Sequence, residues 1–284
     1  MLAQGYDGAV GQANRSRVVV GAVQLTSGND LDANLRRATE LVERARARGA
    51  ELVVLPENFA FMGGEQEKLR IAEELDGSGP IVRTLRDAAR ASAVWIVAGG
   101  MPERAPDPTR PYNACVAFDP EGQLRAVYRK IHLFDVEVGD GQTYRESAAT
   151  SAGDEPVLLE ALGQRIGLSV CYDLRFPELY RRLSALGAEL LVVPAAFTLM
   201  TGKDHWQVLL RARAIENQSW LVAAAQWGEH PGGRRTFGKS CIIDPWGEIV
   251  AQASEGEGVV VAEIDPAMTE RVRASLPALR HRRL

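Results

Sequence analysis

One segment of the chain occurs twice, almost unchanged. Residues 49–59 read GAELVVLPENF and residues 187–197 read GAELLVVPAAF, and each copy follows a strand-like segment and a helix-like segment. A repeated strand, helix and strand ending in proline predicts two similar α/β halves. Each half would bury one sheet face under helices and the other against the second sheet, which gives a four-layer α-β-β-α sandwich. Segments that leave strand ends in the two halves can then converge on one cleft.

The pattern along the chain supports this architecture. Residues 18–25, VVVGAVQL, are largely apolar, which is typical of a buried strand, and the next segment has its apolar residues on one helical face. Helical segments are expected at 66–74 and 80–92, and the turn sequences DPEG and DPWG, at 119–122 and 244–247, predict tight antiparallel connections. No linker rich in serine, glycine or proline separates the halves. We therefore expect one domain over residues 18–284 and a flexible N-terminal extension over residues 1–17.

Charge and composition exclude several classes of protein. The formal net charge is −4 with both signs interspersed, so neither a nucleic-acid partner nor a membrane surface is expected. Residues 1–17 lack the pattern of a secretory signal, and no apolar run approaches the roughly 20 residues that cross a bilayer. Three cysteines without a C-x-x-C pair or a histidine at metal-ligand spacing indicate neither disulfides nor a metal site. These features predict a cytoplasmic protein.

Cys171 is the candidate nucleophile, because it ends the apolar run IGLSVC and polar residues follow at once. The next segment, 176–187, reads as a helix, and amides at a helix N-terminus would favour the thiolate. An inert core cysteine is the alternative at this position. Cys115 and Cys241 lie inside apolar strand-like runs, where a free cysteine acts as a small hydrophobic residue.

Two charged residues elsewhere could assist a thiol. Attack on an amide needs a base for the thiol proton, a donor for the oxyanion and an acid for the departing nitrogen. Glu57 follows an apolar strand and a proline, and Lys130 ends another apolar strand. Their alternative roles are an exposed loop carboxylate or helix cap for Glu57 and an edge-strand lysine for Lys130. His132 and His205 leave a cysteine-histidine pair open as a second chemistry.

A phosphate-binding motif also occurs in the sequence. GRRTFGKS at 233–240 matches G-x-x-x-x-G-K-[ST]. A P-loop must open a helix, whereas Ser240 leads into the apolar segment CIIDPWGEIV, which reads as two strands joined by a turn. We therefore do not expect nucleotide binding here.

Taken together, LPENF, YRKIHLFD and VCYDLRFPELYR resemble the three signature blocks of the nitrilase superfamily of carbon-nitrogen hydrolases. The resemblance extends from about residue 18 to the end. It implies that Glu57 is the general base, Lys130 the oxyanion-stabilising lysine, Cys171 the nucleophile and Glu146 a supporting glutamate. It also implies a nitrilase-type sandwich, a homodimer or higher homo-oligomer, and no cofactor or metal. The segment 205–218 resembles the family's helix near the dimer interface, with glutamine where glutamate is usual.

Within the superfamily, the wording of the motifs is most similar to the deaminated glutathione amidases. The implied reaction is hydrolysis of a small carboxylated amide by water through a cysteine thioester. Omega-amidases acting on 2-oxoglutaramate, N-carbamoyl amino acid hydrolases and a catalytically silent binding scaffold are the alternatives. Selectivity would depend on loops at 58–65, 136–146 and 197–205.

Four further residues are candidates around the nucleophile. The backbone N–H of Tyr172 is expected to bind the oxyanion, and Arg175 could grip a substrate carboxylate through paired hydrogen bonds. An internal ion pair with an acidic neighbour, Asp173 or Glu178, is the alternative for Arg175. Phe197 and Thr198, in the loop after the second repeat copy, are expected to contact substrate.

Overall fold

The computed structural model describes residues 17–137 and 143–283. The extension expected at residues 1–17 lies outside the described residues, apart from Arg17. Part of the expected selectivity loop at 136–146 also lies outside them.

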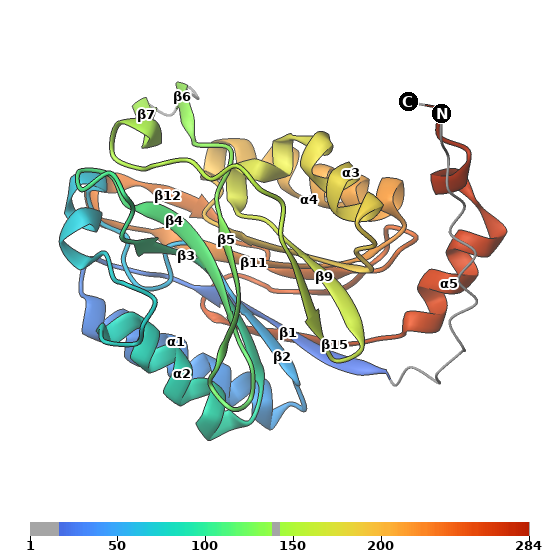
Figure 1. The fold of residues 1–284 in the computed structure, drawn as a ribbon, viewed down its shortest axis with the longest axis horizontal. Helices are drawn as coiled ribbons and strands as arrows, with labels where there is room; N and C mark the ends of the chain where they lie inside the picture. Colours follow the sequence, from blue (N-terminus) through green and yellow to red (C-terminus); the bar gives the residue numbers. More distant parts are fainter. Residues whose placement is uncertain (1–16, 138–142, 284) are drawn as a thin grey trace.

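The first half of the chain forms a sheet with two helices on its outer face (Figure 1). Its elements are β1 (Val18–Leu25), α1 (Leu31–Ala47), β2 (Leu52–Leu55), the 3-10 helix η1 (Glu65–Ile71), α2 (Pro80–Ser92), β3 (Trp95–Glu103), β4 (Tyr112–Phe118) and β5 (Leu124–Arg129). Strands β1, β2 and β3 are parallel, whereas β4 and β5 add to them as antiparallel strands. The apolar face of α1 packs with α2 and the outer sheet face into one buried cluster.

The second half repeats the arrangement. Its elements are β8 (Leu158–Ala161), β9 (Gln164–Leu168), the 3-10 helix η3 (Cys171–Arg175), α3 (Pro177–Ala185), β10 (Leu190–Ala195), α4 (Leu199–Asn217), β11 (Trp220–Glu229), β13 (Cys241–Ile243) and β14 (Ile249–Gln252). Strands β9, β10 and β11 are parallel, and Figure 1 shows α3 and α4 covering this sheet on the side opposite α1 and α2. Units β1-α1-β2 and β9-α3-β10 therefore correspond, as the sequence repeat predicts.

Several short elements complete the chain. They are β6 (Asp135–Glu137), β7 (Thr143–Arg145), η2 (Glu146–Ala148), η4 (Pro231–Gly233), β12 (Arg235–Phe237), β15 (Gly258–Ile264), α5 (Pro266–Ser275) and η5 (Ala278–Arg280). Strand β15 returns to the first half and pairs antiparallel with β1 along its length. No helix among the described residues is long and apolar enough to span a bilayer.

The two sheets face each other across a shared apolar core, so the predicted α-β-β-α sandwich is confirmed (Figure 1). Val20 and Val54 of the first sheet belong to the same buried cluster as Leu168 and Val192 of the second. The sheets join where the end of β1 pairs with β11, at Gln24 with Ala225. This junction brings the carboxyl ends of the central parallel strands of both halves to one end of the sandwich.

The structure differs from the sequence prediction at one helix. Residues 66–74 were expected to be helical, but η1 is a 3-10 helix that ends at Ile71. Glu73 leaves the helical path because its carboxylate accepts hydrogen bonds from the amides of Ile81 and Val82 at 2.7 and 2.9 Å, which caps α2. The prediction was wrong there because this capping interaction links segments that only the tertiary fold brings together.

Both expected tight turns are confirmed. The carboxylate of Asp119 accepts from the amide of Gln123 at 2.8 Å in the β4–β5 hairpin, and that of Asp244 accepts from the amide of Glu248 at 2.9 Å between β13 and β14. The second hairpin follows the segment 233–240. Because Ser240 leads into β13 and not into a helix, that segment does not have the P-loop conformation.

Candidate active site

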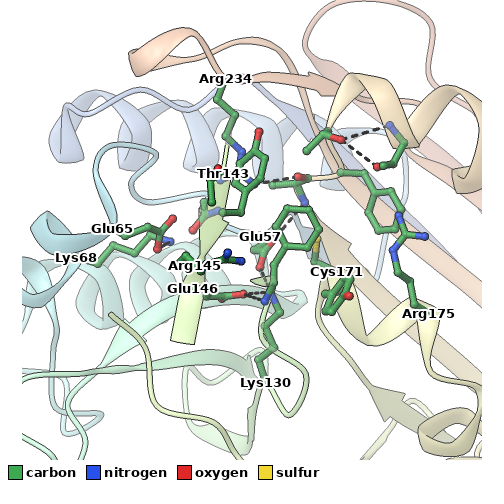
Figure 2. A pocket seen from close by; sticks show the side chains of 18 residues that line it. Glu57, Glu65, Lys68, Lys130, Thr143, Arg145, Glu146, Cys171, Arg175 and Arg234 are labelled. Carbon is green, nitrogen blue, oxygen red and sulfur yellow. Dashed lines mark hydrogen bonds and ion pairs between the residues drawn. The ribbon is translucent and has the colours of Figure 1, made fainter. Parts of the chain in front are cut away.

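Four charged or nucleophilic side chains that the sequence singles out meet in one pocket. Glu57 follows β2, Lys130 follows β5, Glu146 begins η2 and Cys171 begins η3 after β9. The Lys130 ammonium lies 2.9 Å from Glu57 Oε1 and 2.8 Å from Glu146 Oε2 (Figure 2). The Cys171 thiol lies beside the same Glu57 carboxylate, close enough for the two groups to shift each other's pKa. Segments from both halves thus bring a carboxylate, an ammonium and a thiol into contact.

Lys130 is buried but remains charged. Burial alone would lower its pKa, but the carboxylates of Glu146 and Glu57 outweigh burial and raise the pKa well above the ordinary value. An ammonium has three N–H donors, and two of them are used by these carboxylates. The third can be directed at an oxygen that gains negative charge next to the sulfur.

Glu57 is held as an ionised carboxylate by hydrogen bonds on both oxygens. Oε1 accepts from Lys130 and Asn113, and Oε2 accepts from the amide of Ala196 at 3.1 Å. Burial would raise the pKa, but the charge of Lys130 and the hydrogen bonds from Cys171 and Lys130 lower it to about 2. The carboxylate is therefore available to accept a proton throughout the neutral range.

Cys171 has an unusual backbone conformation. Its φ of 49° lies in the left-handed region, which non-glycine residues seldom adopt and which is often found at functional sites. The expectation that helix amides would stabilise a thiolate is wrong here. Cys171 begins the five-residue 3-10 helix η3 and α3 starts only at Pro177, and burial together with the nearby Glu57 charge raises the thiol pKa well above its ordinary value. The resting pair is thus a thiol and a carboxylate, and the proton must move as the sulfur attacks.

Asp173 fixes the turn that carries the nucleophile. Its buried carboxylate accepts from the amide of Val170 at 2.9 Å, the hydroxyl of Tyr128 at 2.7 Å and the amide of His132 at 3.1 Å. Tyr128 and His132 flank Lys130 in the sequence. One carboxylate therefore ties the cysteine turn to the lysine segment, which keeps sulfur and ammonium in register.

Asn113 on β4 is a site residue that the sequence analysis missed. Its Nδ2 donates to Glu57 Oε1 at 3.0 Å and to Glu146 Oε1 at 2.9 Å, so one amide group bridges both carboxylates. Its backbone carbonyl also accepts from the amide of Lys130 at 2.9 Å. The available signal was a polar residue inside the apolar run YNACVAF, which is unusual for a strand interior.

The other candidates around the nucleophile also line the pocket. Tyr172 lies in the first turn of η3, where backbone N–H groups lack partners within the helix. Phe197 and Thr198 line the opposite wall, but the Thr198 hydroxyl already caps α4 by accepting from the amide of Thr201. The Arg175 guanidinium lies over the rings of Tyr172 and Phe197, at 5.9 and 5.2 Å from their centres.

Two alternatives from the sequence analysis, an internal ion pair of Arg175 and a cysteine-histidine pair, do not match the geometry of the described residues. The only polar side-chain partner recorded for Arg175 within the described residues is His205 at 3.3 Å, so the expected ion pair with Asp173 or Glu178 is not formed. His132 bonds to Asp173 and stacks on Phe176, and no described histidine lines the pocket. The structure thus does not contain the cysteine-histidine pair that the sequence left open.

Cys115 and Cys241 are fully buried in strand interiors, as expected. Burial raises the pKa of the Cys241 thiol to about 12 and that of Cys115 still further. Neither lines the pocket, so Cys171 is the one described cysteine placed to react with a substrate.

Further charged residues of the pocket wall were not identified from the sequence. Glu65, Lys68 and Arg145 line the cleft, and so does Arg234, from the loop between β11 and β12 (Figure 2). Arg234 lies inside the GRRTFGKS segment. This segment does not have the P-loop conformation, as expected, but the sequence analysis did not identify its arginine as a pocket residue. The cleft encloses about 610 Å³ when its open mouth is included, which is enough for a small peptide-like amide.

The chain is similar to known proteins over most of its length. The model of a family described as carbon-nitrogen hydrolase matches residues 19–274. A protein of Synechocystis sp. named deaminated glutathione amidase is 50% identical over 264 residues, covering 92% of this chain and 96% of that protein. A human protein of the same name is 41% identical over 282 residues, covering 97% of this chain and 85% of the human one.

Solved structures share the fold. The NitFhit protein of C. elegans superposes with a TM-score of 0.88 at 41% identity, covering 94% of this chain and 65% of that one. Nit3 of Saccharomyces cerevisiae, described as a member of branch 10 of the nitrilase superfamily, gives 0.86 at 32% identity and coverages of 94% and 97%. A Nesterenkonia amidase, 27% identical with a TM-score of 0.79 over 95% of both chains, carries the acetamide moiety of fluoroacetamide on its active-site cysteine.

Proposed function

The chain belongs to the carbon-nitrogen hydrolase family, and we propose that this amidase hydrolyses the amide bond of deaminated glutathione through an acyl-thioester on Cys171. The observation that carries the proposal is the cluster in one pocket where the Glu57 carboxylate accepts a hydrogen bond from the Lys130 ammonium and lies beside the Cys171 thiol. A base, a cation and a nucleophile are the parts that amide cleavage by a thiol requires. The names of the relatives support the choice of substrate.

In the first half-reaction, the Cys171 proton moves to Glu57 while the sulfur attacks the amide carbon. The oxygen of that carbonyl becomes negative and is bound by the free N–H of the Lys130 ammonium and the Tyr172 amide. Each such donor contributes about 2.7–4 kcal/mol to barrier lowering in other oxyanion holes. Protonated Glu57 then gives its proton to the nitrogen, the carbon–nitrogen bond breaks and the amine leaves.

In the second half-reaction, Glu57 takes a proton from water as the water oxygen attacks the thioester carbon. The carbon–sulfur bond breaks, the acid leaves, and the proton returns from Glu57 to the sulfur. Glu146 and Asn113 do not exchange protons in this scheme. They keep Lys130 and Glu57 in position, since both contact these groups directly.

Arg175 is assigned to the carboxylate of the acyl portion. Deaminated glutathione carries a 2-oxo acid at its acyl end, and Arg175 follows the nucleophile by four residues and faces the cleft beside Tyr172 and Phe197. Its guanidinium has no described carboxylate partner, so its paired donors can meet the substrate carboxylate.

The test is product release from deaminated glutathione, with 2-oxoglutaramate, a carbamoyl amino acid and a simple nitrile as competing substrates. Cys171→Ala should abolish release of cysteinylglycine, while the matched Cys115→Ala should retain it. Glu57→Gln should stall turnover so that intact-protein mass spectrometry detects a 2-oxoglutaryl adduct on Cys171. Full activity of Cys171→Ala would exclude the thioester route. Faster cleavage of one of the competing substrates would show that deaminated glutathione is not the preferred substrate.

We also propose that the enzyme forms a homodimer through α4 in the cytoplasm. Val208 and Ile215 of α4 are 67% and 47% exposed, and Trp246 and Val250 of the adjoining β13–β14 hairpin are 55% and 45% exposed. The hairpin is fixed to the helix by the hydrogen bond from Arg211 Nε to the carbonyl of Gly247 at 2.7 Å. A second copy would cover this apolar face, and the free cysteines suit a reducing compartment.

Light scattering should give twice the chain mass, and Val208→Asp should give the monomer. A monomeric wild-type protein at micromolar concentration would contradict the dimer, and fractionation of cells would test the location.

A further inference from the structure

Arg234 has a positive charge in the pocket that the proposed reaction does not use. Its Nη2 donates to the carbonyl of Ala196 at 3.2 Å, and its guanidinium lies 5.4 Å from the centre of the Tyr144 ring. Its Nε is shielded from solvent and has no hydrogen-bond partner among the described residues. A buried donor without a partner is costly unless a ligand satisfies it.

Most other cations of the pocket are already neutralised. Lys68 forms an ion pair with Glu65 at 2.8 Å, Arg145 with Glu137 at 3.1 Å, and Lys130 with its two carboxylates. Of the pocket-lining cations in the described ranges 17–137 and 143–283, Arg175 and Arg234 have no carboxylate partner. The site therefore offers two unpaired guanidinium groups, which suits a substrate with two carboxylates.

The loop that carries Arg234 is a fixed part of the site. The amide of His230 donates to the carbonyl of Arg234 at 2.8 Å, which closes the turn between β11 and β12. The buried His230 ring bonds through Nδ1 to the carbonyl of Ser27 at 2.8 Å and through Nε2 to the Thr236 hydroxyl at 2.7 Å. The loop that carries Arg234 is thus held against the segment that follows β1 in the first half.

The position of Arg234 relative to Glu57 assigns it to one end of the substrate. The leaving nitrogen must lie next to Glu57, because Glu57 gives it a proton. Arg234 lies on the Glu57 side of the cleft and contributes to the low pKa of that carboxylate, whereas Arg175 lies beyond Cys171 (Figure 2). The acyl chain would extend from the sulfur towards Arg175, and the leaving group would extend past Glu57 towards Arg234.

We propose that Arg234 binds the carboxylate of the leaving group and so selects deaminated glutathione over amides that release ammonia. This proposal rests on the proposed function. Deaminated glutathione releases cysteinylglycine, whose glycine carboxylate provides the second anion. 2-Oxoglutaramate has the same acyl chain but releases ammonia, which leaves Arg234 without an anionic partner. Hydrolysis follows the same bond changes for both substrates, so they differ in the leaving group alone, and the glycine carboxylate is the only anion that the larger leaving group adds.

The experiment compares kcat/KM on three substrates: deaminated glutathione, its analogue with the glycine carboxylate converted to an amide, and 2-oxoglutaramate. The variants are Arg234→Gln, Arg234→Lys, Arg175→Gln and the exposed neighbour Arg235→Gln as a matched control. Arg234→Gln should lower kcat/KM for deaminated glutathione by about 10- to 100-fold relative to 2-oxoglutaramate, mainly through KM. Arg234→Lys should recover part of the loss, and Arg235→Gln should behave as wild type.

The wild-type enzyme provides a test that needs no variant. It should cleave the amide analogue about 10- to 100-fold less efficiently than deaminated glutathione, and Arg234→Gln should remove that difference. Arg175→Gln should instead lower activity on all three substrates. Equal losses on all substrates in soluble Arg234→Gln, or an unchanged wild-type rate on the analogue, would overturn the assignment. A wild-type enzyme inactive on deaminated glutathione would overturn the proposed function itself.

Discussion

Among the described residues, the Asn113 side chain is the one neutral donor that bridges the two site carboxylates. Asn113→Ala removes this donor altogether, and Asn113→Asp removes it while keeping the shape of the side chain. Asn113 donates to Glu57 at 3.0 Å and to Glu146 at 2.9 Å. A hydrogen bond to a charged group contributes about 1.5–3 kcal/mol, so both together contribute about 3–6 kcal/mol to this arrangement. Since about 1.4 kcal/mol corresponds to tenfold, Asn113→Ala should lose about 100-fold or more in kcat/KM even after partial relaxation.

The kcat/KM of the Asn113→Asp variant should rise as the pH falls. A third carboxyl group beside Glu57 and Glu146, which share Lys130 as the cation in contact with both, has its pKa raised because burial and like charges favour the neutral form. The neutral acid is populated below that pKa and can donate one hydrogen bond. The kcat/KM of Asn113→Asp should therefore rise at least about tenfold as pH falls from about 8 to about 5, because one hydrogen bond is restored.

The assay is kcat/KM against pH for wild type, Asn113→Ala and Asn113→Asp, with thermal unfolding to confirm that each variant folds. Asn113→Ala should show no acid recovery, because alanine has no proton to gain. A profile of Asn113→Asp parallel to wild type, or an Asn113→Ala enzyme within about threefold of wild type, would refute the bridging role.

Three further outcomes are expected. Iodoacetamide should modify Cys171 alone, and peptide mass mapping of the folded enzyme should find Cys115 and Cys241 unmodified because both are fully buried and neither lines the pocket. The pKa of Glu57 is lowered to about 2, so its stabilising effect is present above its ordinary pKa and is lost only as pH falls through about 2; kcat/KM should thus show no Glu57 ionisation between about pH 5 and pH 9. Asp173→Asn should lower kcat by about tenfold or more and slow Cys171 alkylation, measured by stopped-time quenching, because the nucleophile turn loses a charged acceptor.

The repeat predicted the sandwich, the three short motifs singled out Glu57, Lys130 and Cys171, and Glu146 followed from the family resemblance alone. Glu57 and Cys171 follow the parallel strands β2 and β9, whose carboxyl ends lie at a common edge, whereas Lys130 follows the antiparallel strand β5 and was found from its motif. Asn113 could not be found in this way, because it lies within a strand and its role depends on which carboxylates the neighbouring strands bring near it.

Arg234 illustrates a second limit. Its segment matches a known phosphate motif, and the following strand correctly excludes that interpretation. What the segment does instead depends on the turn closed by His230, which faces residues about 200 positions earlier in the sequence. No local pattern carries that information. The thiolate expectation failed for a related reason, since the protonation of Cys171 depends on burial and on a carboxylate from the other half.

The division of the site between the two halves has a consequence for the chain as it leaves the ribosome. Glu57 is made long before Cys171, and its Oε2 is oriented by the amide of Ala196, while its backbone carbonyl accepts from Gln226 on β11 at 3.0 Å. The thiol therefore meets its proton acceptor only after β10 and β11 have been synthesised and have docked. A polypeptide that still lacks β10 and β11 therefore lacks the Ala196 amide and the Gln226 side chain that hold Glu57 in place beside the sulfur.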